Sequence, residues 1–342
     1  MIVRGKHLSV FAIAVFSTMV AAAGDFVKTK DGIIVHPDQP FSGNAKEVQL
    51  VVMADNIIRV KAVASKEIKQ QQSLIIVGSV QPSVKWEVSS TKQIVSLKTS
   101  KLTATVNLQT GAVAFFDPAG KKIVAEKEAG RSIQPQVFEG ENLFSIRQDF
   151  VTSKDDAWYG LGQHQSGLMN YKSYKVELFQ NNTEVAVPFL ISKNNYGILW
   201  DNYSLTDVGD VRPYLPLSSL KLYSKKGEQG WLTASYGNDK SDPSKITIER
   251  PEATISYEFL NDSKLFLPIE FKPQNGVATW EGSIASEADG VHKFRFSSAG
   301  YMKVWIDGQL LLDRWRQSWN PEISILAVDL QKGTKYSFKL QW

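Results

Sequence analysis

The stretch that decides the fold is Asp156 to Asn202, which reads DAWYGLGQHQSGLMNYKSYKVELFQNNTEVAVPFLISKNNYGILWDN. It begins with a glycine-punctuated segment, Trp158 to Gln163, which we expect to form a loop. It ends with two apolar runs, 185–191 and 196–200, separated by a short polar turn. Such runs are typical of two paired β-strands. The rings and amides of this stretch suit sugar binding, because rings offer flat apolar faces and amides both donate and accept hydrogen bonds.

The chain before this stretch repeats the pattern of short strands and turns. Residues 48–52 and 102–108 alternate between apolar and polar side chains, while Asp55-Asn56 and 117–120 are turn sequences. Pro188 interrupts the run 185–191, and because proline lacks an amide proton we expect it at a sheet edge or a bulge. No long segment has helical periodicity. The sequence therefore predicts an all-β protein built of antiparallel β-sandwiches.

Three motifs, in this order and spacing, resemble the N-terminal β-sandwich domain of glycoside hydrolase family 31: YGLGQ at 159–163, NNTEVAVPFLIS at 181–192 and NYGILWDN at 195–202. The segment LTATVNLQTGAVAFFDPAGKKIV at 102–124 extends the resemblance, which is greatest for bacterial α-xylosidases and α-glucosidases. It implies a galactose-mutarotase-like fold, and it implies that the two catalytic aspartates lie in a downstream (β/α)8 barrel. Because no alternating strand–helix pattern follows Asn202, we expect neither that barrel nor any catalytic residue in this chain.

A second domain follows a polar joint at 225–228. Its most specific motif, VWIDGQLLLDRW at 304–315, resembles the PA14 domain, a β-sandwich module, and contains the hairpin sequence Asp307-Gly308. PA14 inserts are known in family 31 α-xylosidases that act on xyloglucan side chains, so the resemblance implies that branch of the family. We expect a family 31 N-terminal domain at 24–224 and a PA14-like domain at 225–342. The latter is expected to be an insert that is truncated at or near its end.

The first 23 residues have the plan of a secretory signal peptide. Arg4 and Lys6 precede an apolar run from Leu8 to Val20, and small alanines follow at 21–23. The run is shorter than the ~20 residues that a membrane span needs, so the mature chain is expected to have no span. We therefore expect a secreted or periplasmic protein, including one held at the cell surface.

Composition narrows the classes of partner. A net charge of +4 over 342 residues is small, and Lys and Arg do not cluster with aromatic residues, which argues against nucleic acid as a partner. The pair Lys225-Lys226 is interpreted as a solvated turn. With no cysteine, disulfides are excluded, so the fold must be held by burial of its core. The partners that we expect are an oligosaccharide or polysaccharide of xyloglucan type and the missing downstream barrel.

Two groups of residues are the candidate substrate-binding residues. By position, Gln180, Asn181, Asn182 and Thr183 resemble the neighbourhood of a loop that shapes the sugar pocket in family 31; the alternative is a polar turn before the next strand. Trp315 and Trp319, with Arg316 between them, are the candidates in the second domain. The alternative for these tryptophans is that they pack the core or an interface of the module.

Other reactive side chains are given structural roles. Asp155 and Asp156 are adjacent and are interpreted as a solvated turn, because the two carboxyls of a retaining glycosidase must face each other roughly 5–5.5 Å apart. His164 stands alone in a loop and is interpreted as a hydrogen-bonding or surface residue rather than a catalytic base. Sugar-binding PA14 modules of the adhesin type carry an Asp-Asp pair that helps to bind calcium, and here the matching residues, 297–300, read Ser-Ser-Ala-Gly. We therefore expect no metal site and no cofactor.

Three functions fit these features. The first is the N-terminal accessory portion of a secreted retaining α-glycosidase, foremost an α-xylosidase acting on xyloglucan-type oligosaccharides. The second is a stand-alone carbohydrate-binding protein without catalysis. The third is a surface module that uses its PA14-like domain for protein contacts. A chain that ends within a domain favours the first of these functions.

Overall fold

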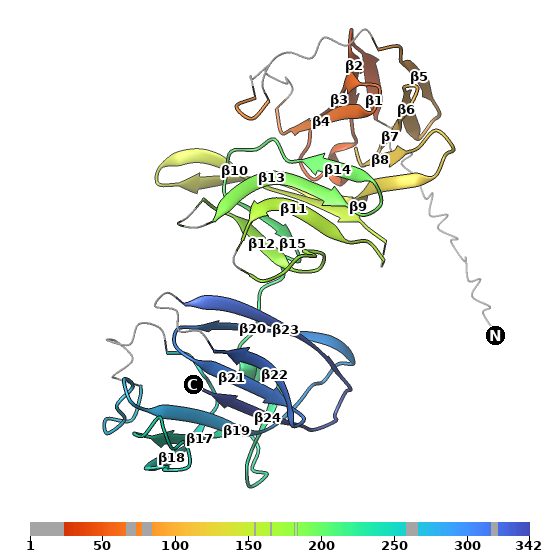
Figure 1. Cartoon of the computed structure of the whole chain (residues 1–342). Helices are drawn as coiled ribbons and strands as arrows, with labels where there is room; N and C mark the ends of the chain where they lie inside the picture. The colour runs from red at the N-terminus through yellow and green to blue at the C-terminus, as the bar shows by residue number, and fades with distance from the viewer. Residues whose placement is uncertain are drawn as a thin grey trace, which may run out of the picture. The chain divides into compact units, whose positions relative to one another are not determined.

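The computed structural model describes residues 24–65, 73–76, 84–153, 155–164, 166–180, 182, 184–257, 266–315 and 321–342. The predicted signal peptide therefore lies outside the described residues. Two compact units make up the chain, Met1–Asp156 with Asn194–Tyr196 and Ala157–Lys193 with Gly197–Trp342. Apart from two short 3-10 helices, η1 (Gln39–Phe41) and η2 (Leu217–Ser219), the regular structure that is described consists of β-strands (Figure 1). The predicted all-β class is confirmed.

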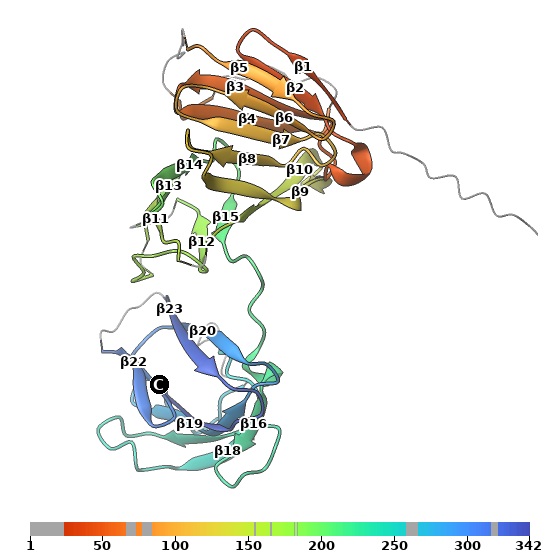
Figure 2. The same ribbon diagram turned by 90° about the vertical axis from the view of Figure 1, so that its right-hand side faces the viewer.

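The first unit contains two antiparallel sheets that pack face to face (Figure 2). One has the order β1-β2-β3-β4, made of Asp25–Lys28, Gly32–His36, Glu47–Ala54 and Ile57–Val63. The other has the order β10-β9-β8-β7-β6-β5; in chain order, β5 to β10 are Glu87–Ser90, Ile94–Lys98, Thr103–Asn107, Val113–Phe116, Lys122–Phe138 and Glu141–Val151.

Alternation along these strands builds the core of the first sandwich. Val48 and Leu50 of β3 are fully buried, and they pack in one cluster with Leu97 of β6 and Val106 of β7. Residues two apart on a strand share a face, so the alternating pattern of 48–52 and 102–108 places every second side chain between the sheets. The hairpin predicted at Asp55-Asn56 is confirmed, because Ala54 pairs with Ile57 across it.

A three-stranded sheet, in the order β11-β13-β14, comes from the stretch that decides the fold. Its strands are Trp158–Gln163, Val185–Ser192 and Tyr196–Leu199, and the smaller pair β12 (Lys175–Leu178) and β15 (Thr206–Gly209) accompanies it. The loop predicted at 158–163 is wrong, because these residues form β11. Positive φ angles at Gly160 (91°), Leu161 (61°) and Gly162 (101°) bulge the strand and leave its pairing with β13 in place.

Glycine is required in this bulge because the partner strand comes very close. A Cβ atom on Gly162 would lie 1.8 Å from the carbonyl oxygen of Val185. Leu161 tolerates its left-handed conformation and is buried in a small cluster with Tyr171 and Leu190. On the opposite strand, the register shift spans Pro188, so the prediction that this proline lies at a bulge is confirmed.

The second sandwich is built from β16 to β24. In chain order these strands are Lys221–Ser224, Leu232–Gly237, Ile248–Glu252, Val277–Ala285, Gly290–Ser298, Met302–Ile306, Gln309–Arg314, Glu322–Leu330 and Tyr336–Gln341. The larger sheet has the order β18-β17-β19-β24-β21-β22, with β16 also paired to β19, and β20 and β23 form a second sheet. Phe294 and Leu326 of that second sheet pack on a core that includes Trp280 and Phe338. The boundary predicted at 224/225 stays a prediction; β16, just before it, pairs with β19.

One buried carboxylate organises this core. Glu252, only 9% exposed, accepts hydrogen bonds from the hydroxyls of Tyr236 (2.5 Å) and Tyr257 (2.7 Å), the indole of Trp280 (2.7 Å) and the guanidinium of Arg250 (2.6 Å). Burial and the bond to Glu252 both raise the pKa of the Tyr236 hydroxyl. A buried carboxylate with four donors ties together side chains of β17, β18 and β19, in addition to the backbone pairing of these strands.

We predict that Glu252→Ala destabilises the second sandwich strongly, because it leaves four donors, including the buried Tyr236 hydroxyl and Trp280 indole, without their acceptor. The expected loss is ~3–5 kcal/mol of unfolding free energy. Glu249→Ala is the matched control: it lies on the same strand, its side chain is 48% exposed, and its ion pair with Lys225 should contribute at most ~1 kcal/mol. Denaturant unfolding of the whole chain, together with hydrogen exchange of the β17 and β19 amides, measures the loss of stability in each of the two variants. Equal losses in the two variants would contradict the role given to Glu252.

Candidate functional site

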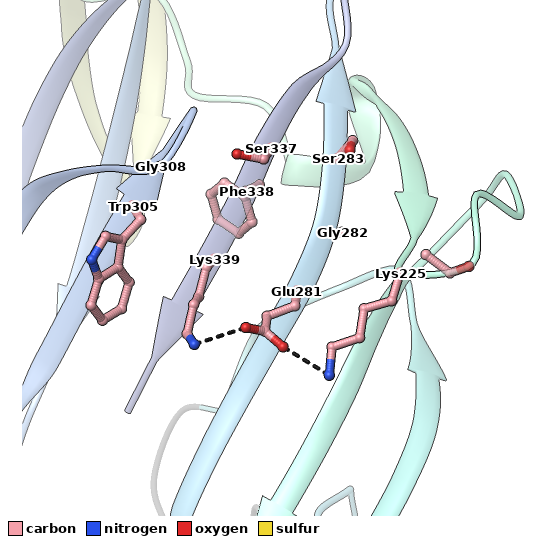
Figure 3. Close-up of a pocket in the computed structure, with 10 residues that line it drawn as sticks. Lys225, Glu281, Gly282, Ser283, Trp305, Gly308, Ser337, Phe338 and Lys339 are labelled. Carbon is pink, nitrogen blue, oxygen red and sulfur yellow. Dashed lines mark ion pairs between the residues drawn. The ribbon is translucent and has the colours of Figure 1, made fainter. Parts of the chain in front are cut away.

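A groove lies on the face of the larger sheet that points away from the second core (Figure 3). Three neighbouring strands each place one side chain in a single row across it. Glu281 of β19 pairs with Lys339 of β24, which in turn pairs with Trp305 of β21. Their strand neighbours Trp280 and Val304 are buried in the core, so alternation turns the row outward.

The groove has a volume of about 630 Å³. Lys225 borders it at one end, and Gly308 at the other. Asp307 and Gly308 have φ angles of 52° and 75°, and Ile306 pairs with Gln309 across them, so the predicted two-residue hairpin is confirmed. The turn joins β21 directly to β22.

Glu281 is the electrostatic centre of the groove. Its two carboxylate oxygens each lie 2.8 Å from a lysine ammonium, one from Lys225 and one from Lys339. Burial acts to raise the pKa of this carboxyl, but the hydrogen bonds from the two lysines outweigh it and hold the pKa below 4.5. Lys339 also places its ammonium 5.5 Å from the centre of the Trp305 ring, within the range of a cation–π interaction. The carboxylate is thus charged and fixed in orientation at neutral pH.

This arrangement is suited to binding, not to glycoside cleavage. A retaining glycosidase needs a nucleophile and an acid/base carboxyl about 5–5.5 Å apart. Among the described residues that line the groove, Glu281 is the single acid. It can accept hydrogen bonds from hydroxyl groups, while the lysines and the hydroxyls of Ser283 and Ser337 can donate them.

Of the residues predicted near 180, the structure describes Gln180 and Asn182. The side-chain amide of Gln180 donates to the carbonyl of Glu184 (2.5 Å) and accepts from the amide of Ala186 (3.2 Å), so it holds the chain that enters β13. Asn182 is exposed. Asn181 and Thr183 lie outside the described residues. A sugar-binding role for this group stays a prediction.

The tryptophans predicted at the end of β22 are only partly placed. Trp315 directly follows that strand and is 76% exposed, so it does not pack the core of the module. Trp319 and Arg316 lie outside the described residues. The role of Trp315 and Trp319 in substrate binding stays a prediction.

Two other predictions concern acidic and basic side chains near β11. The solvated turn predicted at 155–156 is right for Asp155 and wrong for Asp156, which is 5% exposed and accepts a hydrogen bond from the Tyr196 hydroxyl at 3.1 Å. A phenol that packs here needs an acceptor, and the carboxylate supplies it. His164 is a hydrogen-bonding residue as predicted, with Nε2 2.9 Å from the Leu161 carbonyl oxygen, which places the proton on that nitrogen.

The residues of the groove were not predicted from the sequence, since neither Trp305 nor Glu281 nor Lys339 was among the candidates. The solvated turn predicted at Lys225-Lys226 is confirmed, because both residues are exposed in a turn. The Lys225 ammonium also contacts Glu281, because the cross-strand register brings that carboxylate within reach of it. A signal for Trp305 was present in the sequence: in 302–306 the alternation puts Met302, Val304 and Ile306 inward and so turns Trp305 outward.

Within the ranges given above, no helix is long and apolar enough to cross a membrane. In the same part of the chain, no three or more His, Cys, Asp or Glu side chains gather in a way that could hold a metal ion.

We predict that the two lysines keep the pKa of Glu281 low. Lys339→Met should raise that pKa, since burial is then opposed by Lys225 alone. In the wild type, the stabilisation from charged Glu281 should be complete above pH 4.5 and should be lost as the pH falls through the lower pKa of the folded state. An NMR titration of the carboxyl, and melting curves of wild type and Glu281→Gln against pH, measure this. Lys303→Met, which breaks an ion pair with Asp313, is the control; an unchanged Glu281 pKa in Lys339→Met would contradict the prediction.

Comparison with known proteins agrees with both parts of the fold. Residues 47–208 match the family described as the glycosyl hydrolase 31 N-terminal galactose mutarotase-like domain, and residues 227–342 match the PA14 domain. The α-xylosidase of Saccharolobus solfataricus is 29% identical over 205 residues, which cover 57% of this chain and 27% of that protein. The crystal structure of the family 31 α-xylosidase of Xanthomonas citri is 40% identical with a TM-score of 0.78, over 92% of this chain and 34% of that one.

The chain thus spans about a third or less of the length of these relatives. A family 31 glucosidase of Pseudescherichia vulneris, itself uncharacterised, is 23% identical over 168 residues. Both domain matches agree with the strands and sheets described above. The chain carries the N-terminal galactose mutarotase-like domain of glycoside hydrolase family 31, followed by a PA14 domain.

Proposed function

We propose that this chain is the N-terminal, non-catalytic portion of a secreted retaining α-glycosidase, an α-xylosidase acting on xyloglucan-type oligosaccharides. In this role it shapes the sugar pocket and binds carbohydrate. One observation carries the proposal: the similarity to the Xanthomonas citri α-xylosidase runs through both domains, over 92% of this chain at 40% identity. A shared succession of two domains is more specific than a likeness in either sandwich alone, since β-sandwiches host many unrelated functions.

The chemistry of the described residues supports an accessory role. The groove holds a single carboxylate, and the described part of the chain is built of sheets without a (β/α)8 barrel. The pair of carboxyls that a retaining mechanism needs would then come from the part of the relatives that this chain does not cover. The N-terminal pattern of Arg4, Lys6 and an apolar run supports export to the periplasm or beyond.

One face of β13 supports attachment to a larger protein. Val185, Val187, Phe189 and Ile191 alternate on that face and are 39–47% exposed, while Leu190 and Ser192 of the same strand are buried. Tyr159 of the neighbouring β11, paired with Ile191, adds an exposed ring. A row of large apolar side chains on one sheet face is typical of an interaction surface. We assign it to the remainder of the α-xylosidase, which makes up about two-thirds of the Xanthomonas citri enzyme.

A second candidate function is that of a stand-alone carbohydrate-binding or surface-interaction protein. The groove around Trp305 favours it, because the described residues that line it all belong to the second sandwich or to the turn that follows β16. The two functions differ in one testable respect, which is whether this chain supports catalysis when it is joined to the rest of an α-xylosidase.

We predict that the purified chain leaves p-nitrophenyl α-D-xyloside intact. A chimera in which this chain replaces the matching third of the Xanthomonas citri enzyme should hydrolyse it, whereas the enzyme with that third deleted should not. Release of nitrophenolate measures all three. Turnover by the chain alone, or a folded chimera without turnover, would contradict the proposed function. Stable expression without chimeric activity would favour the stand-alone binding protein.

We predict that Val187→Lys destabilises the chimera but not the isolated chain. The ammonium would be buried against the remainder of the enzyme without a counter-charge, at a cost of ~3–5 kcal/mol. Val291→Lys is the control, since Val291 also lies on a strand and is 66% exposed. Thermal unfolding of the two chimeras and of the two isolated variants compares them. Equal melting temperatures for the two chimeras would argue against this interface.

A further inference from the structure

Trp305 is a large aromatic side chain that is part of the core of neither sandwich. Val304 and Ile306, its neighbours on β21, are 0% and 3% exposed and belong to the second core, whereas Trp305 lies on the opposite face. Other tryptophans of this sandwich have structural work: Trp280 bonds Glu252, and Trp342 donates to the carbonyl of Ala299. An indole with no such task, on an open sheet face, offers its apolar ring to a ligand.

The polar groups beside the ring are already fixed in position. Lys339 lies next to Trp305 in the cross-strand row, and its ammonium contacts both the Glu281 carboxylate (2.8 Å) and the ring face (5.5 Å from the centre). Lys225 holds the other oxygen of Glu281. Figure 3 shows these four side chains side by side along the groove. Because Trp305, Glu281 and Lys339 stand on paired strands and Lys225 directly follows β16, little ordering remains to be done when a ligand binds.

A second row supplies hydroxyl groups. Ser283 and Ser337 pair directly across β19 and β24, two residues along from the row of Glu281 and Lys339. Both line the groove. In the described part of the chain their hydroxyls form no hydrogen bond with another side chain, so each is available to a ligand.

A flat apolar face bordered by hydrogen-bonding groups of both signs matches a pyranose ring, which has a C–H face and a rim of hydroxyls. A volume of about 630 Å³ is within the range of small-ligand sites and exceeds what one sugar ring needs. Since Glu281 offsets one of the two lysine charges, the groove has little net charge and suits a neutral sugar. We propose that this groove is a binding site for neutral oligosaccharides, in which Trp305 stacks on a pyranose ring, Glu281 accepts from its hydroxyls and the two lysines donate to them.

This site is distinct from the residues that the sequence predicted. Trp315 follows β22, and Gln180 precedes β13; neither borders the groove. The inference rests on the proposed function only in the choice of sugar, because the relatives are α-xylosidases. The groove would hold a part of the substrate that is not being cleaved.

Calorimetric titration of the full chain with a xylosylated cello-oligosaccharide tests the proposal. Trp305→Ala should weaken binding by about tenfold or more, as expected for an aromatic anchor at the centre of a site. Trp305→Phe, which keeps an aromatic face, should lose less, and Glu281→Gln should weaken binding by several-fold. Tyr301→Ala is the matched control and should bind like the wild type, because its ring is 60% exposed on the same domain and does not line the groove. Trp315→Ala tests the residue that the sequence predicted instead. Circular dichroism verifies that each variant is folded, which we expect because Trp305 lies outside the core.

Several results would contradict the proposed binding site. The site is refuted if Trp305→Ala binds like the wild type, if Trp315→Ala alone loses binding, or if the wild-type chain binds no oligosaccharide at millimolar concentration. Binding of a glucuronic acid oligomer in preference to the neutral probe would overturn the ligand class. If the groove binds no oligosaccharide but the chimera is active, the proposed function stands. If the groove binds oligosaccharide but the chimera is inactive, the binding site stands and the α-xylosidase role is refuted.

Discussion

The buried carboxylate of Glu252 is the constraint on which the second sandwich depends. It lies on β18 and accepts a hydrogen bond from the indole of Trp280, a residue 28 positions further along the chain. That bond fixes β19 with Trp280 facing the core. Because side chains alternate along a strand, Glu281 must then face outward, where Lys225 and Lys339 hold it. The direction of one buried hydrogen bond thus determines which residues line the groove. Loss of the hydrogen bonds to Glu252 would affect both folding and binding, whereas loss of the Trp305 ring would affect binding alone.

A different constraint governs the stretch from 156 to 202. Three successive residues with positive φ, two of them glycines, let β11 bulge while it stays paired with β13, and Pro188 lies in the matching bulge. The side chains of β13 therefore remain in register, with Leu190 inward and Val187 and Phe189 outward. The outward row is apolar, which is costly on a surface that stays in water. This is the physical basis for the proposed attachment of the chain to the remainder of a larger enzyme.

The sequence predicted the features that follow from local rules. The alternation of apolar and polar residues predicted the strands, Asp55-Asn56 and Asp307-Gly308 predicted hairpins, and Pro188 predicted a sheet edge or a bulge. It failed where a local signal had two structural outcomes: the glycines at 160 and 162 were assigned to a loop, although glycine serves equally in a bulged strand. The groove was beyond sequence reasoning for another reason. Glu281, Lys339 and Trp305 come together through the register of strands that are far apart in the chain, and no single-sequence pattern encodes that register. The burial of Asp156 beneath Tyr196 was missed in the same way.

Together these features are the basis of our proposal that the chain holds sugar and leaves its cleavage to another domain. The most direct test is one NMR experiment on the chain labelled at its nine tryptophans, mixed with a xylosylated cello-oligosaccharide. The indole signals report binding, and the anomeric protons of the same sample report hydrolysis. Our account predicts that the Trp305 indole shifts on titration while the anomeric signals stay unchanged overnight. A stationary Trp305 signal, or new anomeric signals from released xylose, would contradict it.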